Sequence, residues 1–100
     1  MQVIRTPEFE LWLETVPAKI QALVESRVFR IEHYDHLGDA KHLEDGLAEL
    51  RWKNGLRVYF ARVGQWVVLL VHGGGKNAQK SDIKKARAIL ERYSDPPIKG

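Results

Sequence analysis

The stretch LAELRWKNGLRVYF, residues 47–60, has the pattern of two β-strands joined by a tight turn at Asn54 and Gly55. Two loops can be built around this Asn-Gly pair, and they place different residues opposite each other. A two-residue loop sets Trp52 opposite Arg57 and mixes charged and apolar side chains on both faces. A three-residue loop with Gly55 in the left-handed conformation makes one face wholly apolar. Because burying an unpaired charge is costly, we predict the three-residue loop. The pairs on its apolar face are Trp52 with Leu56, Leu50 with Val58, and Ala48 with Phe60.

The opposite face of this predicted hairpin is charged. It sets Arg51 opposite Arg57, and Glu49 opposite Tyr59 in the next row. Two arginines that lie side by side repel each other unless a negative group lies between them. The residues leave two interpretations open: the arginines cap the sheet and pair with Glu49, or they bind a phosphate.

The next turn, Gly64-Gln65, fits a two-residue hairpin with glycine first. This register would place Arg57 opposite His72 and Tyr59 opposite Leu70. A neighbouring guanidinium would favour the neutral form of His72, which could act as a base. A lone sheet histidine is more often structural, so both roles stay open for it.

This second register would extend the charged face into a basic row across three strands. Arg51, Arg57 and His72 would lie side by side, with Lys76 just beyond the last strand. The glycines at 73–75 before Lys76 lack the spacing of a phosphate-binding P-loop, although their backbone N–H groups could meet an anion. The same row of side chains is therefore the main candidate site.

The rest of the chain predicts an α+β fold with the order β-α-α-β-β-β-α. Residues 2–5 alternate as a short strand, and Thr6-Pro7-Glu8 has the composition of a helix start. A second helix of roughly 16 residues follows Pro17. Ser81 is the expected N-cap of a last helix, and Pro96 and Pro97 end the regular structure. We expect two N-terminal helices packed on an antiparallel sheet with a C-terminal helix, in one domain of residues 1–100. The three long strands are expected at 47–53, 56–63 and 66–72.

The charge of the chain is divided unevenly between its halves. Residues 1–50 carry five Lys/Arg against ten Asp/Glu, a net charge of −5, whereas residues 51–100 carry eleven against three, a net charge of +8. A basic half favours a polyanionic partner, or simply forms a solvated helix face. Lys80 and Lys84 on the last helix fit either explanation.

Several classes of protein are disfavoured by the composition. The chain has no cysteine, no basic-then-apolar N-terminal segment, and no apolar run near the roughly 18 residues of a membrane span. We therefore expect a cytoplasmic location and no membrane contact. His33 and His36 lie three apart, but no cysteine or suitably spaced acid supports a metal site. No metal and no other cofactor is expected.

Residues 47–90 resemble the C-terminal half of the RelE/ParE superfamily of toxins, close to the HigB-like addiction module killer proteins. The order of the predicted elements fits that family along the whole chain. No single motif carries the resemblance; the ordered set does. The matching segments are Glu49-Leu50-Arg51, Gly55, Arg57-Val58-Tyr59-Phe60, Leu69-Leu70-Val71-His72, Gly75-Lys76 and Asp82-Ile83-Lys84-Lys85-Ala86.

The resemblance implies a type II toxin that cuts mRNA on the ribosome without a metal and is neutralised by an antitoxin, expected to be a helix-turn-helix protein. The toxin–antitoxin complex would bind operator DNA through the antitoxin. Arg57 matches an arginine that holds the scissile phosphate, and Lys76 matches a lysine after the third long strand. Asn77 and Ile83 depart from the family, which often has a basic residue and, in RelE proper, a tyrosine there. A ParE-like protein that inhibits DNA gyrase by binding alone is the alternative, and an inactive remnant is a third possibility.

The implied reaction is attack of a ribose 2′-OH on the adjacent phosphate. It requires a base, positive charge around the phosphorane, and an acid for the leaving oxygen. We assign Arg57 as the transition-state clamp, Lys76 as the electrostatic stabiliser or acid, and His72 as the candidate base. The expected RNA or phosphate contacts are Arg51, Lys53, Tyr59, Lys80 and Lys84.

Overall fold

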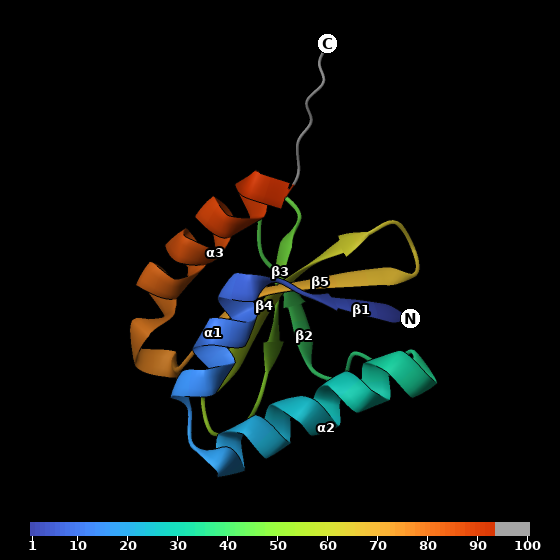
Figure 1. The fold of residues 1–100 in the computed structure, drawn as a ribbon. Coiled ribbons are helices and arrows are strands. Elements are labelled where there is room, and N and C mark those ends of the chain that lie inside the picture. The colour runs from blue at the N-terminus through green and yellow to red at the C-terminus, as the bar shows by residue number, and fades with distance from the viewer. Residues whose placement is uncertain (94–100) are drawn as a thin grey trace.

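The computed structural model describes residues 1–93, and its fold is the predicted α+β arrangement with one strand more than expected (Figure 1). The five strands form a single sheet in the order β1-β5-β4-β3-β2. The sheet is mixed rather than antiparallel, because β1 runs parallel to β5. The elements are β1 (Gln2–Arg5), α1 (Pro7–Thr15), α2 (Ala18–Tyr34), β2 (Ala40–His42), β3 (Leu47–Arg51), β4 (Arg57–Val63), β5 (Val67–Gly74), a 3-10 turn η1 (Lys76–Ala78) and α3 (Gln79–Tyr93).

The first helix begins where the sequence predicts. Thr6 is its N-cap, and the Thr6 hydroxyl accepts a hydrogen bond of 3.1 Å from the backbone N–H of Phe9. Pro7 fills the first turn, where no N–H partner is needed. The second helix ends at Asp35, which takes the left-handed conformation with φ of 55°.

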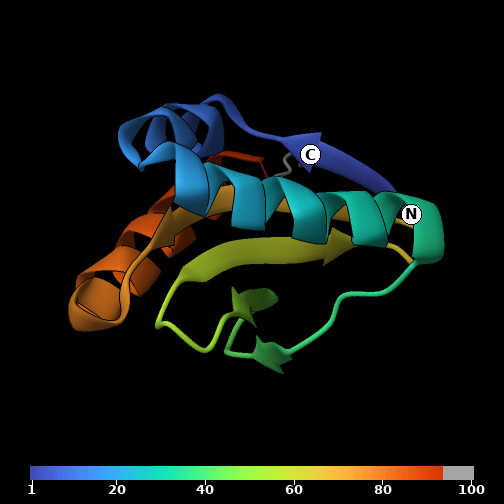
Figure 2. The ribbon, with the colours of Figure 1, turned by 90° about the horizontal axis from the view of Figure 1, so that it is seen from below.

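Helices cover both faces of the sheet. The α1–α2 hairpin packs Phe9, Leu13, Val24 and other buried residues against one face, and Figure 2 shows α2 lying along that face. The α3 helix packs Ala86 and Ile89 on the opposite face, over strands β3 to β5. Each face of the sheet therefore has its own apolar cluster.

The β3–β4 hairpin has the predicted register. Leu50 lies opposite Val58, and Arg51 lies opposite Arg57. The three-residue loop is confirmed, since Trp52 donates to the carbonyl of Leu56 at 3.1 Å and Gly55 has a φ of +96°. The apolar face of this hairpin contributes to the core beneath α1 and α2.

Gly55 also lies close to the side chain of Lys76. A glycine is therefore favoured here for two reasons, the positive φ and the lack of space for a Cβ. A Cβ at this position would lie 2.9 Å from Cβ of Lys76 and would require a disfavoured backbone conformation. We expect Gly55→Ala to lower the free energy of unfolding by about 1–2 kcal/mol. Urea unfolding measures this, with Gly75→Ala as the control. Nothing lies within 4 Å of a Cβ at Gly75, whose φ is −100°. An equal loss of unfolding free energy in Gly55→Ala and Gly75→Ala would contradict the prediction.

The predicted register of the next hairpin is wrong. Val63 pairs with Val67 across three loop residues, and Val71 is an extra residue at a β-bulge. Tyr59 therefore lies opposite His72, and Arg57 lies opposite Gly74. Residues 67–71 are apolar without a break, so either face of this strand could be buried and the pattern could not select the register.

The start of the last helix also differs from the prediction. The chain leaves β5 through η1, and α3 begins at Gln79 rather than after Ser81. The hydroxyl of Ser81 donates back to the carbonyl of Ala78 at 3.1 Å, so it does not act as an N-cap. The predicted end at Pro96 and Pro97 lies outside the described residues. Within residues 1–93, no helix has the length and apolar character that a membrane crossing requires.

Candidate functional site

Four cationic side chains line one groove at the end of the β3–β4 hairpin. They are the predicted catalytic residues Arg57 and Lys76 and the predicted phosphate contacts Arg51 and Lys53. The remaining lining residues are Asp39, Trp52 and Gly55. This groove, which we call the cationic groove, has a volume of ≈ 280 Å³. The hairpin register brings Arg51 and Arg57 together, while the loop after β5 carries Lys76 across Gly55.

A buried carboxylate lies beneath the two arginines. Glu49 is 1% exposed, and its Oε2 lies 3.7 Å from Nε of Arg57 and 4.0 Å from Nε of Arg51. The amide of Gln79 donates to both Glu49 oxygens, at 3.0 and 3.3 Å. Glu49 thus places a negative charge between the guanidinium groups and reduces their mutual repulsion.

These contacts hold Arg57 in place but leave part of its hydrogen-bonding capacity unused. Its Nη1 donates to the carbonyl of Leu56 at 3.3 Å, and its buried Nε has no hydrogen-bond partner in residues 1–93. Its side chain is 13% exposed and lines the cationic groove. The guanidinium can therefore bind an anion in the groove while it keeps its 3.7 Å salt bridge to Glu49.

Tyr59 and the partly buried His72 lie on the sheet face that α3 covers, and His72 meets Asp82 of α3. Nε2 of His72 lies 3.3 Å from Oδ1 of Asp82, and the rings of Tyr59 and His72 stack at 6.4 Å. Tyr59 is 0% exposed, and its hydroxyl has no hydrogen-bond partner within residues 1–93. Burial raises the pKa of Tyr59 far above its usual range, and the negative charges of Glu49 and Asp82 add to the effect.

The predicted site residues therefore divide into two sets. Arg51, Lys53, Arg57 and Lys76 meet in the cationic groove, whereas Tyr59 and His72 lie beneath α3 and do not line it. The nearest charged partner of His72 is Asp82 rather than the predicted arginine. Asp82 is close to the sheet because Gly74 has no Cβ, which would otherwise lie 1.9 Å from Oδ2 of Asp82. Lys80 and Lys84 are exposed on α3 and lie outside the residues that line the groove.

Residues 11–94 match the sequence pattern of the family described as phage derived protein Gp49-like (DUF891). The chain belongs to this Gp49-like family. A relative, an uncharacterized protein of Haemophilus influenzae, is 32% identical over 94 residues, which cover 91% of this chain and 94% of that protein.

The fold of this Gp49-like protein is that of RelE toxins, which confirms the RelE-like fold that the resemblance implies. RelE of the Methanococcus jannaschii RelB–RelE antitoxin–toxin complex aligns with a TM-score of 0.66 at 13% identity, over 78% of this chain and 95% of that one. A mutant Escherichia coli RelE in the free state aligns with a TM-score of 0.68 at 9% identity, over 87% of this chain and 94% of that one. A chain of the Mycobacterium tuberculosis RelBE2 complex aligns with a TM-score of 0.63 at 19% identity, over 74% of this chain and 95% of that one.

The Gp49-like protein has a further cation, Arg27 of α2, that the sequence analysis missed. Its guanidinium lies 4.1 Å from the ring centroid of Trp52, and its Nη2 donates to the carbonyl of Arg51 at 2.8 Å. Arg27 and Leu23 line a hollow that continues from the cationic groove through Asp39, Arg51, Trp52 and Lys53. Nothing in the local sequence distinguishes Arg27 from the other helix arginines, because its partners come from distant segments.

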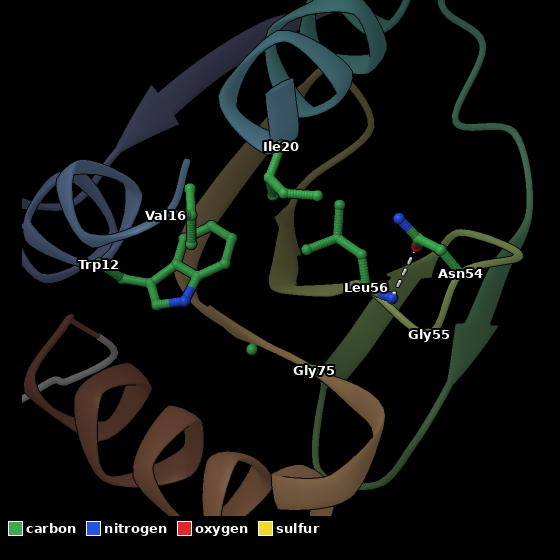
Figure 3. A pocket seen from close by; sticks show the side chains of 8 residues that line it. Trp12, Val16, Ile20, Asn54, Gly55, Leu56 and Gly75 are labelled. Atoms are coloured by element: carbon green, nitrogen blue, oxygen red, sulfur yellow. Dashed lines mark hydrogen bonds between the residues drawn. The ribbon is translucent and has the colours of Figure 1, made fainter. Parts of the chain in front are cut away.

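An apolar pocket of the Gp49-like protein lies beside the cationic groove, since Gly55 lines both. Figure 3 shows this pocket from close by. Its volume is ≈ 250 Å³. The lining residues are Trp12, Val16, Ile20, Asn54, Gly55, Leu56, Gly74 and Gly75. Trp12 packs on Gly73 and remains half-buried.

No metal centre was predicted for this chain. In the part of the Gp49-like protein that the structure describes, no group of three or more His, Cys, Asp or Glu residues is placed to hold a metal ion.

Proposed function

We propose that this Gp49-like protein is the toxin of a type II toxin–antitoxin pair and that it cleaves mRNA on the ribosome. The observation that carries the proposal is the convergence of Arg51, Lys53, Arg57 and Lys76 in one groove. Four cations around one small volume match a phosphodiester that gains negative charge during cleavage. The RelE-like fold supports the same proposal, although one fold can host several activities.

In the proposed reaction a ribose 2′-OH attacks the adjacent phosphorus, and the bond to the 5′-oxygen of the next nucleotide breaks. Arg57 binds the phosphate through its guanidinium, and Arg51 contacts a second phosphate oxygen. Lys76, which is exposed at the edge of the groove, stabilises the phosphorane or protonates the leaving oxygen. Lys53 holds the flanking backbone. Lys80 and Lys84 are proposed to contact RNA or phosphates beyond the groove.

His72 is proposed as the base and Tyr59 as a supporting RNA contact, and both require α3 to move. Nε2 of His72 contacts Asp82, the fourth residue of α3, and Tyr59 is covered by the same helix. Opening of the first turn of α3 would expose both side chains to the groove.

The role of His72 can be tested with a near-isosteric replacement. With His72 as the base, His72→Gln stops mRNA cleavage without lowering the melting temperature. Glutamine can keep a hydrogen bond to Asp82 but cannot take up a proton at neutral pH. Primer extension and thermal unfolding measure the two effects. Full cleavage by the variant would leave His72 with an anchoring role for α3 only.

The proposed partners follow from the toxin assignment. The protein structures from Methanococcus jannaschii and Mycobacterium tuberculosis are complexes with antitoxins. We propose a cognate antitoxin for this chain, a helix-turn-helix protein through which the complex binds operator DNA. The ribosome and mRNA are the proposed targets, in the cytoplasm.

The experiment that tests the function maps mRNA ends in cells that express the protein. Translation-dependent cuts that appear by primer extension support the ribonuclease. Intact mRNA together with inhibited DNA gyrase would instead assign a ParE-like binding toxin. Cells that continue to grow with intact mRNA would remove the toxin proposal.

A further inference from the structure

The apolar pocket beside the cationic groove has no part in the chemistry proposed above. Trp12, Val16 and Ile20 form its helical side, and Leu56 lies on its sheet side (Figure 3). Beyond Leu56 the sheet side is backbone, because Gly74 and Gly75 have no side chains. The pocket thus offers a flat aromatic ring and open backbone rather than charged groups.

Gly55 lines both the apolar pocket and the cationic groove. Because Gly55 has no side chain, only backbone of the turn separates the two volumes at this point. Lys76 packs against the same glycine from the groove side. A phosphate held by Lys76 and Arg57 therefore places its own nucleoside next to the pocket.

Asn54 adds one fixed polar group to the mouth of the pocket. Its Oδ1 accepts a hydrogen bond of 3.0 Å from the backbone N–H of Leu56, which sets the orientation of the amide. The Nδ2 group makes no hydrogen bond within residues 1–93 and points away from that bond in Figure 3. The pocket thus combines an aromatic face with one hydrogen-bond donor.

We propose that the apolar pocket binds an unpaired nucleobase attached to the phosphate in the cationic groove. The inference rests on the proposed function and adds a base subsite to it. A base presents a π face to the indole of Trp12 and ring acceptors to Nδ2 of Asn54. Proteins that bind single strands commonly combine a basic groove with aromatic stacking in this way. The position of the pocket beside four cations favours a base over an apolar side chain of a protein partner.

The test compares two labelled single-stranded oligodeoxynucleotides, which lack the 2′-OH and cannot be cleaved. One carries all its bases, and the other is abasic at every internal position, so both have the same phosphates. Fluorescence anisotropy should show that the wild-type protein binds the base-containing probe about tenfold more tightly or better. Equal affinity for the two probes would overturn the base subsite and leave the proposed ribonuclease function standing. Failure to bind either probe would overturn the base subsite and the proposed phosphate site in the groove, whereas the ribonuclease function is decided by the mRNA cuts described above.

Filling the pocket should remove this preference. Val16→Phe fills it from the end of α1 and Ile20→Phe from α2, where Val16 is the C-cap of α1. Both should bring the two affinities within about twofold while binding of the abasic probe stays unchanged. Leu11→Phe adds the same ring system on the exposed side of α1 and should keep the wild-type ratio. Thermal unfolding checks that all three variants fold. An unchanged ratio in both filled variants, with lost neutralisation by the antitoxin, would assign the pocket to a protein side chain and overturn the proposal.

Discussion

Replacing Arg57 by alanine is expected to abolish growth arrest and to lower the rate of mRNA cleavage by about 10²–10³-fold. Arg57 is the most enclosed cation of the groove, with a side chain 13% exposed and a buried Nε that lacks a hydrogen-bond partner in residues 1–93. In an enclosed site a guanidinium stabilises developing phosphorane charge far better than an exposed lysine does. The measurements are cell growth after induction and single-turnover cleavage on programmed ribosomes.

Arg62→Ala is the matched control for this prediction. Arg62 lies on the same strand, is exposed, and donates to the carbonyl of Gln65 at 2.5 Å, away from the groove. The Arg62→Ala protein should arrest growth as the wild type does. Arg57→Ala must also keep a cooperative thermal transition for its phenotype to be assigned to chemistry. A folded, fully toxic Arg57→Ala protein would remove Arg57 from the mechanism.

Replacing Glu49 by alanine is expected to lower the free energy of unfolding by about 3 kcal/mol. The substitution removes a carboxylate that is 1% exposed and leaves Arg57 partly buried without its counter-charge. It also leaves the amide of Gln79 without its acceptor, which loosens the start of α3. Urea unfolding measures the loss, and cleavage should fall with it because Arg51 and Arg57 are no longer held together.

Glu49→Gln separates the charge of this side chain from its shape. Glutamine keeps the size and one acceptor for Gln79 but removes the negative charge between the arginines, so a smaller loss of about 1–2 kcal/mol is expected. Glu14→Ala, an exposed acid on α1, should change stability by less than about 0.5 kcal/mol. If Glu49→Ala proved as stable as Glu14→Ala, the carboxylate would have no compensating role.

The sequence could predict the first hairpin and not the second because their strands differ in pattern. In residues 47–60 only one register buries apolar side chains alone, so Arg51 and Arg57 had to be neighbours. Residues 67–71 are apolar on both faces, and the bulge at Val71 has no residue signature. The three-residue loop and the bulge each displace the register by one residue, and together they moved His72 from Arg57 to Tyr59.

The groove was predictable to the extent that it depends on local sequence. Arg51, Arg57 and the nearby Lys53 follow from one turn, and Lys76 follows from the end of the next strand. The burial of Tyr59 and His72 depends on where α3 packs, and that packing depends on the close approach of Asp82 to Gly74. The place of Arg27 depends on Trp52 and Arg51, far away in the sequence. Such long-range contacts leave no periodic pattern to detect.

The parallel pairing of β1 with β5 sets the order in which the molecule can be completed. Gln2 pairs with Val67 and Arg5 pairs with Leu70, so β1 has no neighbour in the sheet until β5 has been made. Pairing across so long a separation slows folding, because the chain loses the entropy of closing a long loop before the contacts between the two strands can stabilise it. A nascent chain cut short before β5 lacks the strand that lies between β1 and β4, and it lacks Lys76. The cationic groove can therefore form only after β5 and Lys76 have been synthesised.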